Sequence, residues 1–143
     1  MKRIAALFAL LFAAVLPGLA DEGPPVKAAF YYKVKWGAQT EFESLFFKNY
    51  YPLLQAQITE GRRVTGAQVY RPTHHGDCRA DWTFLVVVTY KNAEASVESS
   101  HDEAIIKRLF PEQEKYKKEE ARRFELLDAH WDVPLTAVAP PKD

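Results

Sequence analysis

The chain consists of runs whose successive side chains alternate between two faces, as in strands, and of segments whose apolar residues recur at helical spacing. The most regular run is Trp82–Tyr90, where every residue is β-branched, aromatic or leucine, the types that fit a buried pleated surface. Alternate residues of a strand point to opposite faces, so Trp82 and Phe84 share one face. Leu85 and Val87 share the other. Because both faces are apolar, this run predicts a central strand that is covered on both sides.

The residues before this run predict a strand followed by a broken helix. Lys27–Trp36 alternates and is the expected first strand. Thr40–Glu43 matches a capping box, in which the threonine and the glutamate satisfy exposed backbone N–H groups, so a helix is expected to open at Thr40. Pro52 lacks an N–H group and predicts a kink or break near Tyr50–Tyr51. Gly61 is the expected C-terminal end of this helix.

The rest of the chain predicts a hairpin, further helices and a last strand. The polar residues Pro72–Asp81 join a strand to the central one as an antiparallel hairpin. Asn92 and Ser100–Glu103 are expected caps, and Pro111 is expected at the first position of a helix whose charged residues form a solvated face. The expected elements are a strand at Val64–Arg71, helices at Ala93–Ser99, Asp102–Phe110 and Pro111–Arg123, and a strand at Phe124–Val133.

The element order β-α-β-β-α-β is that of the α+β ferredoxin-like fold, a four-stranded antiparallel sheet with the helices on one face. Nothing in the chain remains to cover the second apolar face of the sheet. A large bare apolar face favours self-association, and two-fold symmetry is the commonest way to bury one surface against itself. The sequence therefore predicts a homodimer, and it leaves open which face the helices cover.

One short motif adds a family resemblance. The first helix runs into an aromatic-X-Pro-Leu turn, Tyr50-Tyr51-Pro52-Leu53. With the element order, this resembles the dimeric α/β-barrel superfamily, which includes EthD-like, NIPSNAP-like and antibiotic-biosynthesis-monooxygenase-like proteins. The resemblance spans about residues 27–133 and implies two sheets closed face to face into a barrel. EthD-like members often have histidine where this chain has Tyr50, which argues against their histidine-dependent chemistry here.

The N-terminus predicts export. Lys2 and Arg3 precede an unbroken apolar run and the small residues Gly18 and Ala20, which is the pattern of a secretory signal peptide. An uncleaved anchor is the alternative, although the run is short for a membrane span. We expect residues 1–20 to be a signal peptide of a bacterial periplasmic or secreted protein. A lead-in (21–26), a single domain (27–133) and a proline-containing tail (134–143) follow.

Charge and cysteine content exclude several classes of protein. Without Lys2 and Arg3, 17 basic residues face 19 acidic ones, which does not indicate a nucleic-acid or membrane partner after cleavage of the signal. The single Cys78 cannot form an internal disulfide. The His74–Cys78 turn supplies one cluster of ligand types where zinc usually has two, so no metal is expected. No phosphate loop or other cofactor motif occurs, so no cofactor is expected.

Aromatic residues with polar tips are the candidate site. Aromatic walls with a few polar groups suit a planar organic ligand, although core packing explains the same residues. Asp128, His130 and Asp132 share a face of the last strand, where a carboxylate could orient the histidine as a general base or all three could simply be solvated. The candidate ligand-binding residues are Tyr32, Tyr50, Trp82 and Phe84, and the candidate proton-transfer residues are His130, Tyr32 and Tyr50.

Three functions remain open on the sequence alone, because one fold hosts many functions. The first is an exported dimeric barrel protein that binds a small apolar or aromatic molecule in the barrel. The second is a small cofactor-independent enzyme of the kind that the resemblance implies, in which the pocket shields a phenolic substrate and supplies a proton acceptor. The third is a structural, stress-associated dimer without a ligand.

Overall fold

The computed structural model describes residues 23–73, 82–98 and 102–139. The expected signal peptide and the His74–Cys78 turn lie outside these ranges. The strands are β1 (Val26–Val34), β2 (Val64–Tyr70), β3 (Phe84–Tyr90) and β4 (Leu127–Leu135). The helical segments are α1 (Gln39–Leu45), η1 (Phe46–Tyr50, a π-helix), α2 (Tyr51–Thr59), α3 (Ala93–Val97), α4 (Glu103–Leu109) and α5 (Gln113–Glu125).

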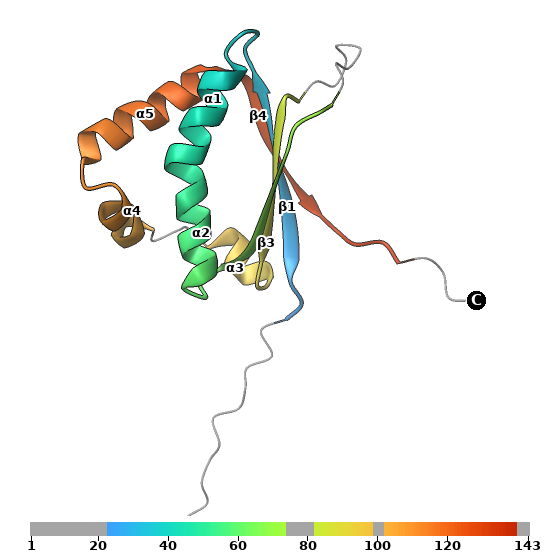
Figure 1. The fold of residues 1–143 in the computed structure, drawn as a ribbon. Coiled ribbons are helices and arrows are strands. Elements are labelled where there is room, and N and C mark those ends of the chain that lie inside the picture. Colours follow the sequence, from blue (N-terminus) through green and yellow to red (C-terminus); the bar gives the residue numbers. More distant parts are fainter. Residues whose placement is uncertain (1–22, 74–81, 99–101, 140–143) are drawn as a thin grey trace, which may run out of the picture.

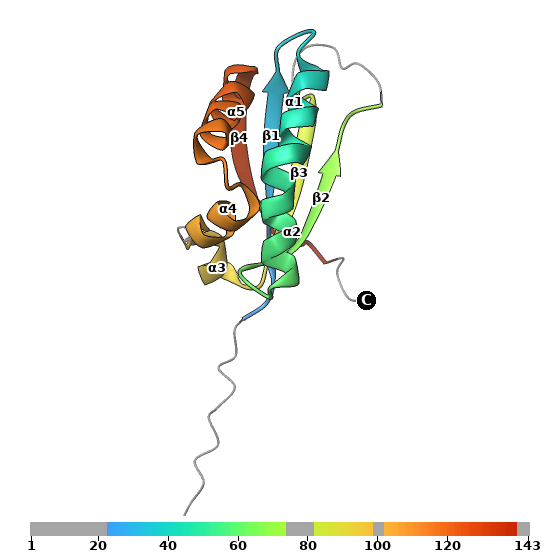
Figure 2. The ribbon, with the colours of Figure 1, turned by 60° about the vertical axis from the view of Figure 1, so that its left-hand side comes forward.

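The four strands form one antiparallel sheet in the order β2-β3-β1-β4. All helices lie on the same side of this sheet (Figure 1), and α1–α2 run along it beside α5 (Figure 2). The expected α+β ferredoxin-like fold is therefore confirmed, as is the central position of β3. None of the described helices is long and apolar enough to cross a membrane.

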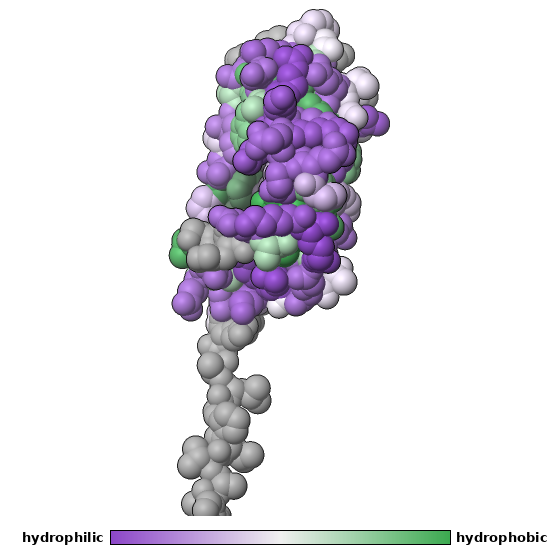
Figure 3. Space-filling view, turned by 90° about the vertical axis from the view of Figure 1, so that its left-hand side faces the viewer, coloured by the Kyte–Doolittle hydropathy of each residue, from purple (hydrophilic) through white to green (hydrophobic). Residues whose placement is uncertain are grey.

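The structure decides which face of the sheet the helices cover. Phe84, Val86 and Val88 are buried on the helix side. Leu85 and Val87 point to the opposite side, which we call the open face. The outward surface of the helices is largely hydrophilic (Figure 3). Because the described helices all pack on this one side (Figure 1), the described part of the chain covers only one face of the sheet.

The first helix begins earlier than its sequence predicted. Gly37 has a left-handed backbone (φ 83°) that turns the chain directly into the helix, so Ala38 is the N-cap residue and its carbonyl accepts from Phe42 N–H at 3.0 Å. Thr40 already lies inside the first turn and caps nothing. The predicted capping box at Thr40–Glu43 is therefore wrong.

Other predicted ends are also corrected. Pro111 lies in the turn before α5, where its carbonyl accepts from Gln113 N–H at 3.0 Å, and the N-cap residue is Glu112. Asp102 is the N-cap residue of α4 without a side-chain cap bond. Phe124 belongs to α5 and not to the last strand, because the helical hydrogen bonds continue to Leu126. The Asn92 cap is confirmed, since its side chain accepts from Ala95 N–H at 2.7 Å.

The predicted kink or break near Tyr50–Tyr51 is not found, because the chain stays helical from Gln39 to Thr59, but the helix changes its form there. Between α1 and α2 the helix widens into the π-helix η1, in which Tyr51 N–H bonds to the carbonyl of Phe46, five residues earlier. Pro52 lies in the first turn of α2, directly after the π-helical turn. Gly61, with φ 62°, ends the helix as predicted.

Candidate functional site

On the helix side, the half of the sheet formed by β1 and β4 is only partly covered. On the neighbouring strand β3, the residues that face the helices are fully buried. On β1, Ala28 and Phe30 face the same side but are only half-buried. Their β4 register partners, Pro134 and Asp132, are exposed. The helices thus leave this half accessible from the β4 edge, and the candidate site lies at this place.

Arg123 is the charged residue at the centre of the candidate site. Although it lies on the charged helix α5, it is only 2 % exposed, so its predicted place on a solvated face is wrong. Its guanidinium donates to both carboxylate oxygens of Glu120, at 3.0 and 2.6 Å. It also lies over the rings of Phe124 (4.5 Å) and Tyr50 (5.3 Å), where cation–π attraction holds it.

One nitrogen of this guanidinium lacks a well-placed acceptor. Arg123 Nη1 is buried and has no acceptor at ordinary hydrogen-bond geometry among the described residues, although the Tyr32 hydroxyl is near enough for a hydrogen-bonding contact with Arg123 that lowers the pKa of that phenol. A buried N–H group without an acceptor is costly, and such groups in native proteins usually meet an ordered water or a ligand. Arg123 Nη1 is therefore the strongest sign of a binding function at this site.

Tyr32 and Tyr50 both interact with Arg123 and remain protonated at neutral pH. Burial is the main cause: it raises the pKa of Tyr50 to about 12, and it raises the pKa of Tyr32 further. The charge of Tyr50 adds to the increase in the pKa of Tyr32, and that of Tyr90 adds to the increase in the pKa of Tyr50, while Arg123 opposes both increases. Both phenols are thus neutral groups that can donate or accept a hydrogen bond.

His130 closes the site at the β4 edge. It is the register partner of Tyr32, and the two rings lie 4.4 Å apart between centroids. Burial, and then the charge of Arg123, lower its pKa, while Asp132 raises it from a distance of 3.3 Å between Nε2 and Oδ1. The imidazole is therefore mostly neutral at pH 7 and can accept a proton.

The π-helix positions two of the residues around the site. The extra residue of η1 directs Tyr50 toward Arg123 and buries the neighbouring Asn49, whose Nδ2 donates to Glu119 at 3.2 Å. Single π-helical turns often occur at functional sites. The proline after this turn was visible in the sequence, whereas the π-helix itself was not.

Of the predicted ligand-binding residues, the structure brings three together. Tyr32, Tyr50 and Phe84 all contact Phe46, at 6.4, 5.6 and 4.8 Å between ring centroids. Trp82 precedes β3 and its ring contacts Tyr31, which points to the open face. The three clustered residues thus lie between the helices and the sheet of the chain, and not on the face that would close a barrel.

A second buried polar cluster lies beyond Tyr50. Gln57 donates to Asp102 at 2.9 Å, and Arg63 lies 4.0 Å from the same carboxylate and 5.5 Å from the centre of the Tyr90 ring. Gln57 Oε1 and Arg63 Nε are buried and have no hydrogen-bond partner within the described ranges. With Tyr50 between them, the two clusters form a polar layer inside the helix–sheet interface.

A separate cleft of about 150 Å³ lies among the helices, and it differs in character from the candidate site. It is lined by Lys48, Asn49, Leu109, Phe110, Pro111, Glu112, Lys115, Tyr116 and Glu119. Its basic and acidic side chains pair with each other, as Lys48 does with Glu119 at 2.5 Å. Residues 23–73, 82–98 and 102–139 contain no group of three or more potential metal ligands.

Comparisons with solved structures bear on the fold. No protein-family model matches the chain, and no curated protein matches it significantly. A hypothetical protein of Arabidopsis thaliana is 15% identical, with a TM-score of 0.54 over 85% of this chain and 95% of that one. SnoaB, a cofactor-independent oxygenase from Streptomyces nogalater, is 14% identical, with a TM-score of 0.47 over 85% of this chain and all of that one.

A dimeric ferredoxin-like protein of unknown function from Thermobifida fusca is 11% identical, with a TM-score of 0.49 over 81% of this chain and 93% of that one. At these identities the similarity concerns the fold alone. The similarity to the Arabidopsis protein agrees with the ferredoxin-like fold of this chain. The activity of this chain has to be argued from its own residues.

Proposed function

We propose that this protein is an exported, homodimeric binding protein for a small aromatic or apolar molecule. The observation that supports this most is the convergence of Tyr32, Tyr50 and His130 on the buried Arg123, whose Nη1 has no acceptor at ordinary hydrogen-bond geometry in the described part of the chain. Apolar walls with a few convergent polar groups are the usual composition of a small-molecule site.

Each part of the site has a role in this proposal. The half-buried Ala28 and Phe30 offer an apolar surface on which a flat molecule can lie, and the exposed β4 edge gives it access. Tyr32 and Tyr50 supply neutral hydrogen-bonding groups at its end. The ligand therefore binds within each protomer, between the helices and the sheet.

Native mass spectrometry of protein purified from its host tests the proposal. We expect a mass near twice that of one chain, with an added small molecule that is lost under mild activation. The same experiment on Phe30→Glu, which places a charge on the proposed floor, should give the protein without the added mass. Lys118→Asp, a charge change on the outer surface of α5, is the matched control and should retain the molecule. Wild-type protein that never carries or takes up such a molecule would contradict the proposal.

A second candidate function, a cofactor-independent enzyme, is favoured by His130. A neutral imidazole next to a carboxylate at 3.3 Å is an arrangement suited to accepting a proton from a bound phenol. If an activity is found, His130→Gln should lower its rate by about 10²–10⁴-fold, the usual effect of losing a positioned acid–base group. An undiminished rate in this variant, and in Tyr32→Phe and Tyr50→Phe, would exclude these residues from the chemistry.

Export is a further part of the proposal, based on residues 1–20. N-terminal sequencing of the periplasmic or secreted protein should begin at or next to Asp21, because small residues precede it. Intact Met1 on membrane-bound protein would contradict cleavage.

A further inference from the structure

The cleft of about 150 Å³ among the helices is a second place where a small molecule can bind, apart from the candidate site. Cavities of this volume in other proteins accept a molecule as large as one benzene ring. Part of the lining is apolar: the rings of Phe110 and Tyr116 stack with 4.5 Å between centroids, and Leu109 and Pro111 add to this surface. The other lining residues are polar or charged: Lys48, Asn49, Glu112, Lys115 and Glu119.

The charges in this cleft are balanced and paired. Lys48 Nζ donates to Glu119 Oε1 at 2.5 Å, and Asn49 Nδ2 donates to Glu119 Oε2 at 3.2 Å. Lys115 Nζ lies 3.7 Å from Glu112 Oε1. The hydrogen bond from Lys48 is the main cause that lowers the pKa of Glu119, so this carboxylate is ionised at neutral pH. The lining thus carries two positive and two negative charges.

The two partners of the pair between Lys48 and Glu119 differ in their freedom to move. The Lys48 side chain is 51 % exposed and can swing into solvent on its flexible stem. The Glu119 side chain is only 22 % exposed and is also held by the buried Asn49. Opening the pair therefore costs little at the lysine, whereas the carboxylate stays in the cleft and needs a new partner.

This difference restricts the charge of a ligand. A carboxylate that took Lys48 would leave Glu119 without its counterion in a partly buried place, which is costly. An amine that took Glu119 would gain nothing from Lys48. A molecule with one charge of each sign compensates both residues and adds no net charge to the cleft.

We propose that this cleft binds a small zwitterion, an amino acid with a short apolar side chain. Its ammonium group donates to Glu119 and its carboxylate accepts from Lys48, so each partner of the opened ion pair gains a new one. Its apolar side chain lies against Leu109 and Phe110. This site and its ligand are independent of the proposed function above.

Three molecules that share one isobutyl group test the site by calorimetric titration of the wild-type protein: L-leucine, 3-methylbutylamine and 4-methylpentanoate. The amine lacks the carboxylate of leucine, and the acid lacks its ammonium group. We expect leucine to bind about tenfold more tightly than either analogue, because each analogue loses one charge-assisted hydrogen bond.

Variants then locate the binding. Glu119→Gln removes the partner of the ammonium group, so leucine should bind about tenfold more weakly and no more tightly than 4-methylpentanoate. Lys48→Met should reduce the affinity for leucine to that for 3-methylbutylamine. Glu114→Gln is the matched control, because Glu114 pairs with Lys117 at 3.1 Å on the same helix but does not line the cleft. This control should bind leucine as the wild type does, and urea denaturation of each variant checks that it is folded.

Three outcomes would overturn the site. Leucine that binds wild-type protein no more tightly than its two analogues would show that the cleft does not recognise a zwitterion. Leucine that binds Glu119→Gln as tightly as wild-type protein would place the ligand outside the cleft. Absence of binding by all three molecules would refute the site outright. None of these outcomes affects the proposed function, which has its own ligand and its own test.

Discussion

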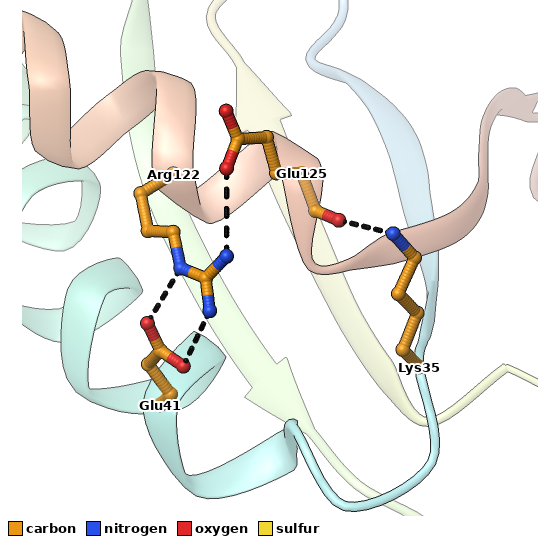
Figure 4. Close-up of polar contacts among 4 residues, drawn as sticks. All are labelled: Lys35, Glu41, Arg122 and Glu125. Carbon is orange, nitrogen blue, oxygen red and sulfur yellow. Dashed lines mark hydrogen bonds and ion pairs between the residues drawn. The ribbon is translucent and has the colours of Figure 1, made fainter.

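Arg122 and Arg123 are neighbours on α5 with the same side chain and opposite environments. Arg122 is half exposed and pairs across the surface with Glu41, at 2.8 and 3.1 Å, while Lys35 bonds to the nearby carbonyl of Glu125 (Figure 4). Arg123 is buried against Glu120 and three aromatic rings. Replacing each of the two residues therefore allows the contribution of a surface ion pair to stability to be compared with that of a buried ion pair.

Replacing each arginine with methionine should give very different stabilities. Arg123→Met leaves the carboxylate of Glu120 without its partner in a mostly buried place, and we expect a loss of about 3–5 kcal/mol in the free energy of unfolding. Arg122→Met breaks a pair that water already screens, and its midpoint of urea denaturation should stay close to that of the wild type. Equal shifts of the two midpoints would show that Arg123 is not the buried charge described here.

Tyr50 predicts a loss of stability at alkaline pH. Its pKa is raised by burial to about 12, above the ordinary value of 10, so the folded state keeps a proton that the unfolded state releases. The stabilisation is complete below pH 10 and is lost as the pH rises from 10 toward 12. In urea denaturation between pH 8 and 11, Tyr50→Phe should show a smaller decrease above pH 10 than the wild type. Parallel curves over the whole range would contradict this.

The sequence predicted the residues of the candidate site better than it predicted their arrangement. His130, Tyr32 and Tyr50 were recognisable as polar tips on apolar elements, and the structure gathers them. Arg123 was missed because its neighbours on α5 are nearly all charged, so the segment looked solvated. The available signal was the helical spacing of Tyr116, Glu120 and Arg123, which places one inward row on that helix.

At the scale of elements, the connection between α1 and α2 shows what a sequence pattern can and cannot reveal. Pro52 predicted an interruption, since it cannot donate a helical hydrogen bond. It could not predict that the chain would add one residue to a turn and continue in nearly the same direction. That choice depends on the packing of Phe46 and Asn49 against the sheet and α5, which no local pattern contains.

Deleting Lys48 should convert the π-helix into an ordinary α-helix. The hydrogen bond from Tyr51 N–H to the carbonyl of Phe46 then spans four residues, so α1 and α2 keep their relative orientation. We expect the helical circular dichroism signal and cooperative urea unfolding to be retained.

Two further variants control this deletion. Deleting Gln55 in the regular helix α2 should abolish cooperative unfolding, because it rotates the buried Gln57 away from its place. Lys48→Ala accounts for the lost ion pair with Glu119. If the two deletions are equally disruptive, the π-helix is not the tolerant position that its hydrogen bonding indicates.

In the part of the chain that the structure describes, the sheet has one face covered by helices and one face without a cover. On the open face, Tyr31 stacks on Trp131 with 5.3 Å between ring centroids, beside Leu85 and Val87. The exposed large apolar side chains of this face are Tyr70, Trp131, Val133 and Leu135. The helical surface is largely hydrophilic (Figure 3), and the charged side chains that β1 contributes to the open face are Lys27 and Lys33. An apolar face of this kind marks an interaction surface.

The number of helices and strands in the sequence predicted one covered and one uncovered sheet face, and the dimer that this implies can be tested by measuring the mass in solution. Burial of a sheet face against its own copy removes on the order of 800 Å² per protomer from water, at about 25 cal/mol per Å² of apolar surface. Light scattering of the protein at micromolar concentration should therefore give about twice the chain mass. Val87→Asp places a charge at the centre of the open face and should give a folded monomer or an unfolded chain. Lys118→Asp, a charge change on the helical surface, should remain dimeric. A wild-type protein that is monomeric, folded and free of aggregation at that concentration would refute the dimer.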